Sequence, residues 1–166
     1  MPTAVKFHYQ FNMRDTAKIV QNLMLAAPSV YKGNLLGLAR MWAHECQRVI
    51  HDRLLFDEDR NAYMNFMRNG LKELVEFKEE SIFAEPLLYS SFVDICKGHE
   101  PAYKSIDDYD ELRLILEDKL AEYNENISAM ELVLFNQAME HICRISRIIH
   151  QPAGNALLVG VGGSGK

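Results

Sequence analysis

Apolar residues in the first 78 positions recur at intervals of three and four, which predicts three amphipathic helices. The first helix begins after Asn12, where Asp15 three places on gives a capping-box-like start, and runs to about Leu25. The second begins after Asn34 and carries one apolar stripe. The stripe consists of Leu35, Leu38, Trp42, Cys46, Val49 and Arg53, whereas His44, Arg48 and His51 lie mostly off it.

The third helix is introduced by three acidic residues, Asp57, Glu58 and Asp59, which complement the positive end of a helix dipole. Its predicted buried side consists of Tyr63, Phe66, Met67, Leu71 and Leu74. The first 78 residues are therefore predicted to form a small helical unit.

Residues 79–108 lose this periodicity and are interrupted by Pro86, Gly98 and Pro101, which indicates a boundary between domains. The segment is too apolar for a free linker, so we expect it to pack along the unit that follows. Its apolar residues include Phe83, Leu87, Leu88, Phe92 and Val93.

Helical periodicity resumes near Tyr109 and breaks at residues 124–126. A further helix is predicted from Met130 to Ile149, and Pro152 and Gly154 end it. The sequence thus predicts a mostly helical chain up to this point.

A change of period follows, because residues 156–161 form a continuous apolar run typical of a buried parallel strand. The last two residues of this run and the five that follow fill the first seven places of the phosphate-binding pattern G-x-x-x-x-G-K-[ST]. These residues are Gly160, Val161, Gly162, Gly163, Ser164, Gly165 and Lys166. Such glycines turn backbone N–H groups toward phosphate oxygens, and Lys166 adds a positive charge. The hydroxyl residue that would hold Mg²⁺ falls after Lys166, so we expect the chain to be a piece of a larger protein.

Composition excludes several classes of protein. Hydrophobic residues at 48% and charged residues at 25% are globular values, and a net charge of −5 argues against a nucleic-acid-binding surface. No stretch has the length of a signal peptide's apolar core or of a membrane span, so we expect a soluble intracellular protein. The three scattered cysteines are expected to be reduced, and buried and inert.

Other site chemistry finds little support. A metal site from His44 and Cys46 with His51, or from His141 and Cys143, is not expected, because helix positions two apart point in nearly opposite directions. The acids at positions 107, 108, 110, 111, 117 and 118 are read as a helix start and a solvated face. No catalytic triad pattern is present. Arg14 is either a surface arginine or a residue that faces a nucleotide.

Two stretches resemble the dynein heavy chain family in its own order. "HYQFNMRDTAKIVQNL", residues 8–23, resembles the helical lid that closes the third AAA+ module of the motor ring. "AMEHICRISRIIHQPAGNALLVGVGGSGK", residues 138–166, resembles the start of the fourth module and its Walker A loop. Residues 40–54 are similar to a helix of the family's lid, and residues 120–145 to the helices that precede the fourth module. The sequence of the loop resembles that of axonemal members of the family.

The resemblance implies a fold and domain boundaries. It implies a helical AAA+ lid subdomain at 1–78, a connector between modules at 79–108, and at 109–166 the helices, first strand and P-loop of an α/β AAA+ core. Arg14 falls at the sensor 2 position of the lid, and Gly160 to Lys166 match the Walker A loop. The chain has no counterpart of a Walker B acid, sensor 1 or arginine finger, so by itself it is catalytically incomplete.

The resemblance also implies a function. The family comprises minus-end-directed microtubule motors driven by ATP, in which the third and fourth modules regulate. The implied cofactors are ATP or ADP with Mg²⁺. The implied partners are neighbouring AAA+ modules, microtubules reached through distant parts of the chain, and light and intermediate chains, with no nucleic acid or membrane. The implied location is the cytoplasm, cytoskeleton and ciliary or flagellar axoneme.

Two alternatives of other classes stay open. The chain could be a truncated small P-loop NTPase or kinase, or a helical binding module whose glycine loop never holds a nucleotide.

Overall fold

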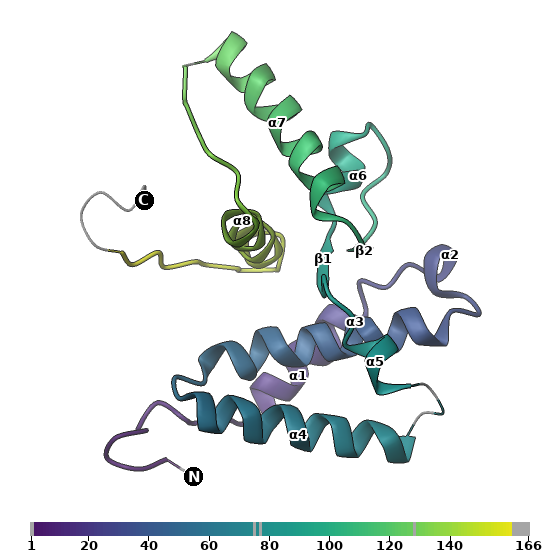
Figure 1. Ribbon diagram of the computed structural model, residues 1–166, viewed down its shortest axis with the longest axis vertical. Coiled ribbons are helices and arrows are strands. Elements are labelled where there is room, and N and C mark those ends of the chain that lie inside the picture. Colours follow the sequence, from purple (N-terminus) through teal and green to yellow (C-terminus); the bar gives the residue numbers. More distant parts are fainter. Residues whose placement is uncertain (1, 75, 77, 128, 161–166) are drawn as a thin grey trace. The chain divides into compact units, whose positions relative to one another are not determined.

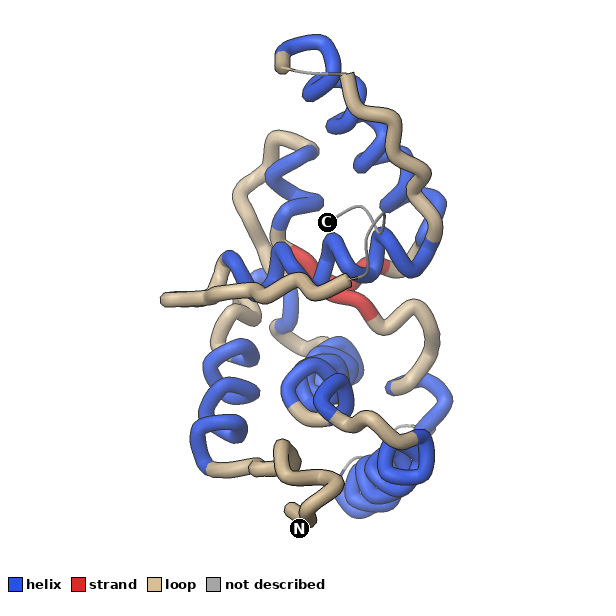
Figure 2. The backbone as a smooth tube through the Cα atoms, turned by 90° about the vertical axis from the view of Figure 1, so that its left-hand side faces the viewer, coloured by secondary structure: helices blue, strands red, loops and turns tan. Residues whose placement is uncertain are grey.

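The computed structural model describes residues 2–74, 76, 78–127 and 129–160, most of which lie in helices (Figure 1). Two short strands pair into one small sheet, as Figure 2 shows in red. The mostly helical fold class predicted from periodicity is confirmed. The chain separates into two compact units, unit 1 with Met1–Tyr89 and Ala102–Asp107, and unit 2 with Ser90–Pro101 and Asp108–Lys166.

Unit 1 holds the predicted helices and most of the sheet. Its elements are α1 (Met13–Leu23), α2 (Pro28–Tyr31), α3 (Leu35–Val49), the 3-10 helix η1 (His51–Arg53), α4 (Asp57–Leu74), α5 (Glu79–Ile82), β1 (Leu88–Ser90, whose last residue falls in unit 2) and β2 (Lys104–Ile106). The capping box at Asn12 and Asp15 is confirmed, and the Asn34 side chain accepts a hydrogen bond from the Gly37 N–H at the start of α3. Helix α1 ends two residues before the predicted Leu25.

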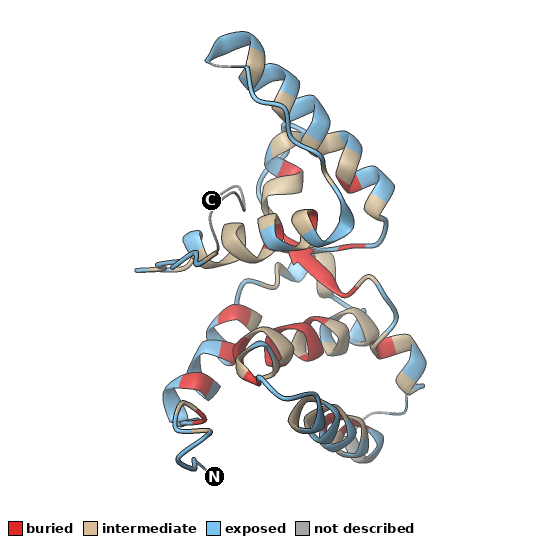
Figure 3. Ribbon diagram, turned by 60° about the vertical axis from the view of Figure 1, so that its left-hand side comes forward, coloured by how far each residue is buried: buried red, intermediate tan, exposed pale blue. Residues whose placement is uncertain are grey.

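Helix α3 is the centre of unit 1. The apolar stripe predicted for it is confirmed at Cys46 and Val49 but was wrong at the start of the helix. Leu35 and Leu38 at its start are exposed, whereas His44, predicted off the stripe, is buried. The buried residues of α3, shown in red in Figure 3, are Met41, Ala43, His44, Glu45, Cys46 and Val49. Four consecutive buried positions mean that the middle of the helix is covered on every side, because α1, α2 and α5 all pack against it.

The core of unit 1 also takes in part of the segment predicted to lie along the following unit. Ile82, Leu87 and Tyr89 pack in one cluster with Met41 of α3. That prediction was wrong for these residues, because their apolar side chains complete the surface around α3.

Helix α4 buries Met67 and Leu71 as predicted, and Met67 packs with Ile19 and Cys46. Phe66 was predicted to be buried but is 73% exposed, because α4 covers the core with only a narrow stripe. The side chain of Leu74 lies outside the described part.

Unit 2 contains α6 (Phe92–Cys96), α7 (Tyr109–Asn126) and α8 (Asn136–Ile149). Helix α7 begins and ends as predicted. The predicted start of α8 at Met130 was wrong, because the carbonyl of Leu134 accepts a hydrogen bond from Arg113 of α7 instead of joining a helix. Among the described residues, no helix combines the length and the apolar character needed to cross a bilayer.

The end of α8 explains the glycine that follows it. A Cβ atom at Gly154 would lie 1.7 Å from the carbonyl oxygen of Ile148, so only glycine fits there. The predicted stop after Ile149 is confirmed.

Candidate functional site

The predicted phosphate-binding loop lies almost entirely outside the described residues. Gly160 is described and half-buried, whereas Val161, Gly162, Gly163, Ser164, Gly165 and Lys166 are not among the described residues. The glycine amides and the lysine ammonium remain a donor set suited to a polyphosphate on chemical grounds.

The strand predicted to lead into this loop is not formed over its described residues, 156–160. Leu157 and Val159 are 88% and 86% exposed. A strand needs a neighbour to hydrogen-bond with, and the two described strands pair with each other. The apolar run is therefore an unpaired segment in this structure.

Arg14, the other predicted site residue, lies in the first turn of α1. Its backbone N–H donates to the Asn12 Oδ1 at 2.9 Å, so the position of its backbone is set by the cap. Its side chain is exposed and makes no hydrogen bond or ion pair within the described ranges. The guanidinium is therefore available to a group outside this chain.

Arg53, at the end of η1, holds the segment around Arg14. Its Nη1 donates to Asp15 Oδ1 at 2.9 Å, and its Nη2 donates to the carbonyl of Gln10 at 3.0 Å. Its guanidinium carbon lies 4.7 Å from the centre of the Phe11 ring. The backbone N–H of Asn12 and the Arg53 guanidinium keep the pKa of Asp15 below its usual value.

A buried polar cluster lies on the middle of α3, and sequence reasoning missed it. Glu45 is fully buried, and it accepts hydrogen bonds from Asn22 Nδ2 and from the Tyr103 hydroxyl, both at 2.6 Å. The Nδ1 atom of His44 lies 3.3 Å from Glu45 Oε1. A buried carboxylate is tolerated only with such partners, so Glu45 joins α1, α3 and the segment that precedes β2. The sequence signal that could have revealed this cluster is a charged residue, Glu45, among apolar residues in the middle of a predicted helix.

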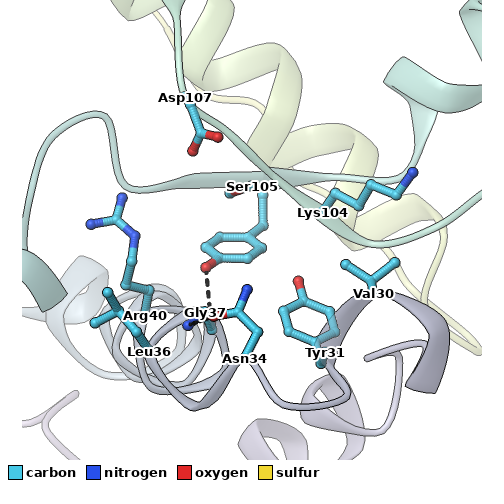
Figure 4. Close-up of a pocket in the computed structure, with 10 residues that line it drawn as sticks. Val30, Tyr31, Asn34, Leu36, Gly37, Arg40, Lys104, Ser105 and Asp107 are labelled. Atoms are coloured by element: carbon cyan, nitrogen blue, oxygen red, sulfur yellow. Dashed lines mark hydrogen bonds between the residues drawn. The ribbon is translucent and has the colours of Figure 1, made fainter.

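A cavity of about 380 Å³ lies in unit 1 beside α2, α3 and β2 (Figure 4). It is lined by Val30, Tyr31, Asn34, Leu36, Gly37, Arg40, Tyr89, Lys104, Ser105 and Asp107.

The polar groups of this cavity are largely occupied by the fold. Arg40 donates to the carbonyls of Ser81 and Ala84 at 2.8 and 3.0 Å, and the Tyr31 hydroxyl donates to the carbonyl of Tyr103 at 2.9 Å. Burial raises the pKa of Tyr31 to about 12, so its phenol stays neutral at physiological pH. The cavity is therefore best explained by packing.

The acidic residues at the start of α7 behave as the helix-start interpretation predicts. The Asp108 side chain accepts from the Asp110 N–H at 3.0 Å, and Asp110 and Glu111 lie in the first turn. Glu111 also pairs with Lys97 at 2.5 Å. These carboxylates stabilise the helix and its surface.

Cysteine and histidine residues give no metal centre within the described part of the chain. Cys46 and Cys143 are buried free thiols, and burial raises the pKa of each to about 12. Cys96 is free and half-buried. The expectation that the cysteines are buried is confirmed for Cys46 and Cys143 and was wrong for Cys96.

Comparison with known proteins identifies both parts of the chain. The sequence profile of the AAA+ lid domain matches residues 1–84, just over half of the chain. The profile described as the P-loop containing dynein motor region D4 matches residues 130–166. The chain is 47% identical over 175 aligned residues to the dynein beta chain of the flagellar outer arm of Chlamydomonas reinhardtii. It is 43% identical to the ciliary dynein beta chain of Tripneustes gratilla and 40% identical to mouse dynein axonemal heavy chain 17, each over 167 residues.

The chain belongs to the AAA+ lid domain family through residues 1–84, and over its whole length it is similar to axonemal dynein heavy chains.

The chain spans only a small part of the length of these relatives. The three alignments cover all of it but only 4% of each relative. The AAA+ lid match takes in α1 to α5, and the D4 match takes in α8 and the residues that follow. Helices α6 and α7 lie between the two matches.

Proposed function

We propose that the chain is part of an ATP-driven, minus-end-directed microtubule motor of cilia or flagella, at the junction of its third and fourth AAA+ modules. In this proposal residues 1–78 are the lid of the third module, 79–108 are the connector, and 109–166 begin the fourth module. One observation carries the proposal: an AAA+ lid match and a dynein D4 P-loop match follow each other on one chain.

The residues that would hold a nucleotide lie at the end of the chain. Gly160 to Lys166 would bind the phosphates of ATP or ADP through backbone N–H groups and the Lys166 ammonium. A bound Mg²⁺ would neutralise phosphate charge. Since the sequence lacks the other AAA+ motifs, the role of this segment is binding and regulation, with hydrolysis completed by other residues.

Arg14 has a separate role in the proposal, as the sensor 2 arginine of the preceding module. Its exposed and unpaired guanidinium supports that role, because a phosphate-contacting arginine has to be free of competing carboxylates before the nucleotide arrives. The partners proposed with this role are the neighbouring modules, microtubules, and light and intermediate chains, and the proposed location is the axoneme.

The experiment is microtubule cosedimentation of the native polypeptide, followed with an antibody raised against residues 1–166. Extracts of isolated cilia and of cell bodies without cilia are compared. The proposal predicts a polypeptide many times heavier than this chain, confined to cilia, that pellets with microtubules without ATP and is released by ATP. A small polypeptide that is present in both extracts and does not pellet with microtubules would contradict the proposal. It would favour a small P-loop enzyme or a binding module.

A further inference from the structure

Arg14 has an exposed side chain in the first turn of α1, and hydrogen bonds of the helix cap hold its backbone. Its own N–H is bonded to Asn12 Oδ1 at 2.9 Å, and the Asn12 N–H is bonded in return to Asp15 Oδ2 at 3.0 Å. The bond from the Asn12 N–H to Asp15 is one half of the capping box of α1, whose other half is the bond that the Asn12 side chain accepts from the Asp15 N–H. Together with the bond from the Arg14 N–H, they hold the backbone from which the Arg14 side chain extends.

Arg53 adds a second layer of support from outside the helix. Its fork bonds Asp15 and the carbonyl of Gln10, and its flat face lies over Phe11, so it contacts residues on both sides of Arg14. The planar guanidinium makes two hydrogen bonds and a ring contact at once, which a lysine ammonium cannot do. The Asp15 carboxylate is shared, with one oxygen in the cap and the other on Arg53.

We propose that Arg53 and Asp15 are positioning residues that aim Arg14 at a nucleotide phosphate. The inference rests on the proposed function, because it requires that Arg14 faces a nucleotide. An arginine contributes to phosphate binding only when its own support is rigid, since a displacement of about 1 Å forfeits most of a charged hydrogen bond.

The contacts that Arg53 makes with Asp15, Gln10 and Phe11 are not explained by folding stability alone. The Arg53 side chain is 39% exposed, and an ion pair with one exposed partner contributes little to folding. These contacts surround the turn that carries Arg14, whereas the core of unit 1 lies around α3. A loss of Arg53 should therefore affect nucleotide binding more than unfolding.

The test measures the binding of a fluorescent ADP analogue with a methylanthraniloyl label to the intact heavy chain. The variants are Arg14→Ala, Arg53→Gln, Arg53→Lys and the double variant Arg14→Ala with Arg53→Gln. Lys18→Gln is the matched control, because it removes a positive charge from the exposed side of the same helix.

Arg14→Ala is expected to weaken one class of nucleotide sites by about tenfold, the effect of losing one hydrogen bond to a charged group. Arg53→Gln should weaken the same sites by a smaller factor, and Arg53→Lys should restore only part of the loss. The double variant should be no weaker than Arg14→Ala, because Arg53 has nothing left to position. Lys18→Gln should bind like the unmodified chain.

Three outcomes would overturn parts of the account, and they are distinguishable. Unchanged binding in Arg14→Ala would remove the proposed nucleotide role of Arg14 itself. A loss in Arg14→Ala together with normal binding in Arg53→Gln would overturn the positioning role alone. A double variant that is weaker than Arg14→Ala by the full factor of Arg53→Gln would show that Arg53 acts independently of Arg14.

Discussion

The Tyr103 hydroxyl donates a hydrogen bond of 2.6 Å to Oε1 of Glu45, and both residues are buried. Tyr103 lies 58 positions after Glu45 in the chain, and Asn22 of α1 reaches the other carboxylate oxygen from the opposite side in sequence. One acidic residue in the middle of α3 thus joins three segments of unit 1.

Replacing Tyr103 by Phe should destabilise this unit by about 2 kcal/mol, because a buried carboxylate oxygen loses its donor. Urea unfolding of residues 1–166 measures the change, followed by the fluorescence of Trp42, the one tryptophan of the sequence. Tyr123→Phe is the control, since this tyrosine is exposed on α7 and should change stability by less than about 0.5 kcal/mol. Equal unfolding curves for the two variants would show that the bond to Glu45 contributes nothing.

The stability of unit 1 should decrease at acidic pH, in part because Asp15 becomes protonated. The Asn12 N–H and Arg53 lower the pKa of Asp15 in the folded chain, so its carboxylate stabilises the fold above the ordinary value of 3.8. This contribution is lost as the pH falls below 3.8 and through the lowered folded pKa.

The Asp15→Asn variant should therefore be less stable at neutral pH and should lose less stability on acidification. Urea unfolding at a series of pH values from neutral to below 3.8 tests this, with Asp57→Asn as the control because Asp57 is an exposed residue of α4. Parallel stability curves for Asp15→Asn and the unmodified chain would contradict the assigned cause.

Thiol reactivity should separate the three cysteines. The pKa of about 12 at Cys46 and Cys143, against an ordinary 9.0, leaves each with about a thousandfold less thiolate at mildly alkaline pH. Iodoacetamide should therefore label Cys96 first, as read by mass spectrometry of peptides. All three should react at similar rates in denaturant, and early labelling of Cys46 in the folded chain would contradict its burial.

Local signals in the sequence were enough to predict the three long helices of unit 1, α1, α3 and α4, but not the short helices α2, η1 and α5. Asn12, Asn34 and the acidic start of α4 act through bonds and dipoles within a single turn, and such features can be read from a few residues. The boundaries of α7 follow for the same reason.

Long-range contacts decided the features that the sequence did not reveal. Glu45 is buried because Asn22 and Tyr103 arrive from distant segments, and a periodicity argument places a glutamate on the surface. Strands β1 and β2 are only three residues each and exist through their pairing. The run from residue 156 shows the reverse case, since its composition favours a strand but no partner strand is present among the described residues.

The nucleotide-binding role of the loop is the central claim, and it depends most on Lys166. The direct measurement is the number of fluorescent ATP molecules bound by each intact heavy chain, in the unmodified protein and in Lys166→Ala. Lys119→Ala is the control, because Lys119 is an exposed lysine of α7 that pairs with neighbouring Glu122. The account predicts one fewer bound nucleotide in Lys166→Ala and no change in Lys119→Ala. An unchanged number and affinity in both variants would contradict it.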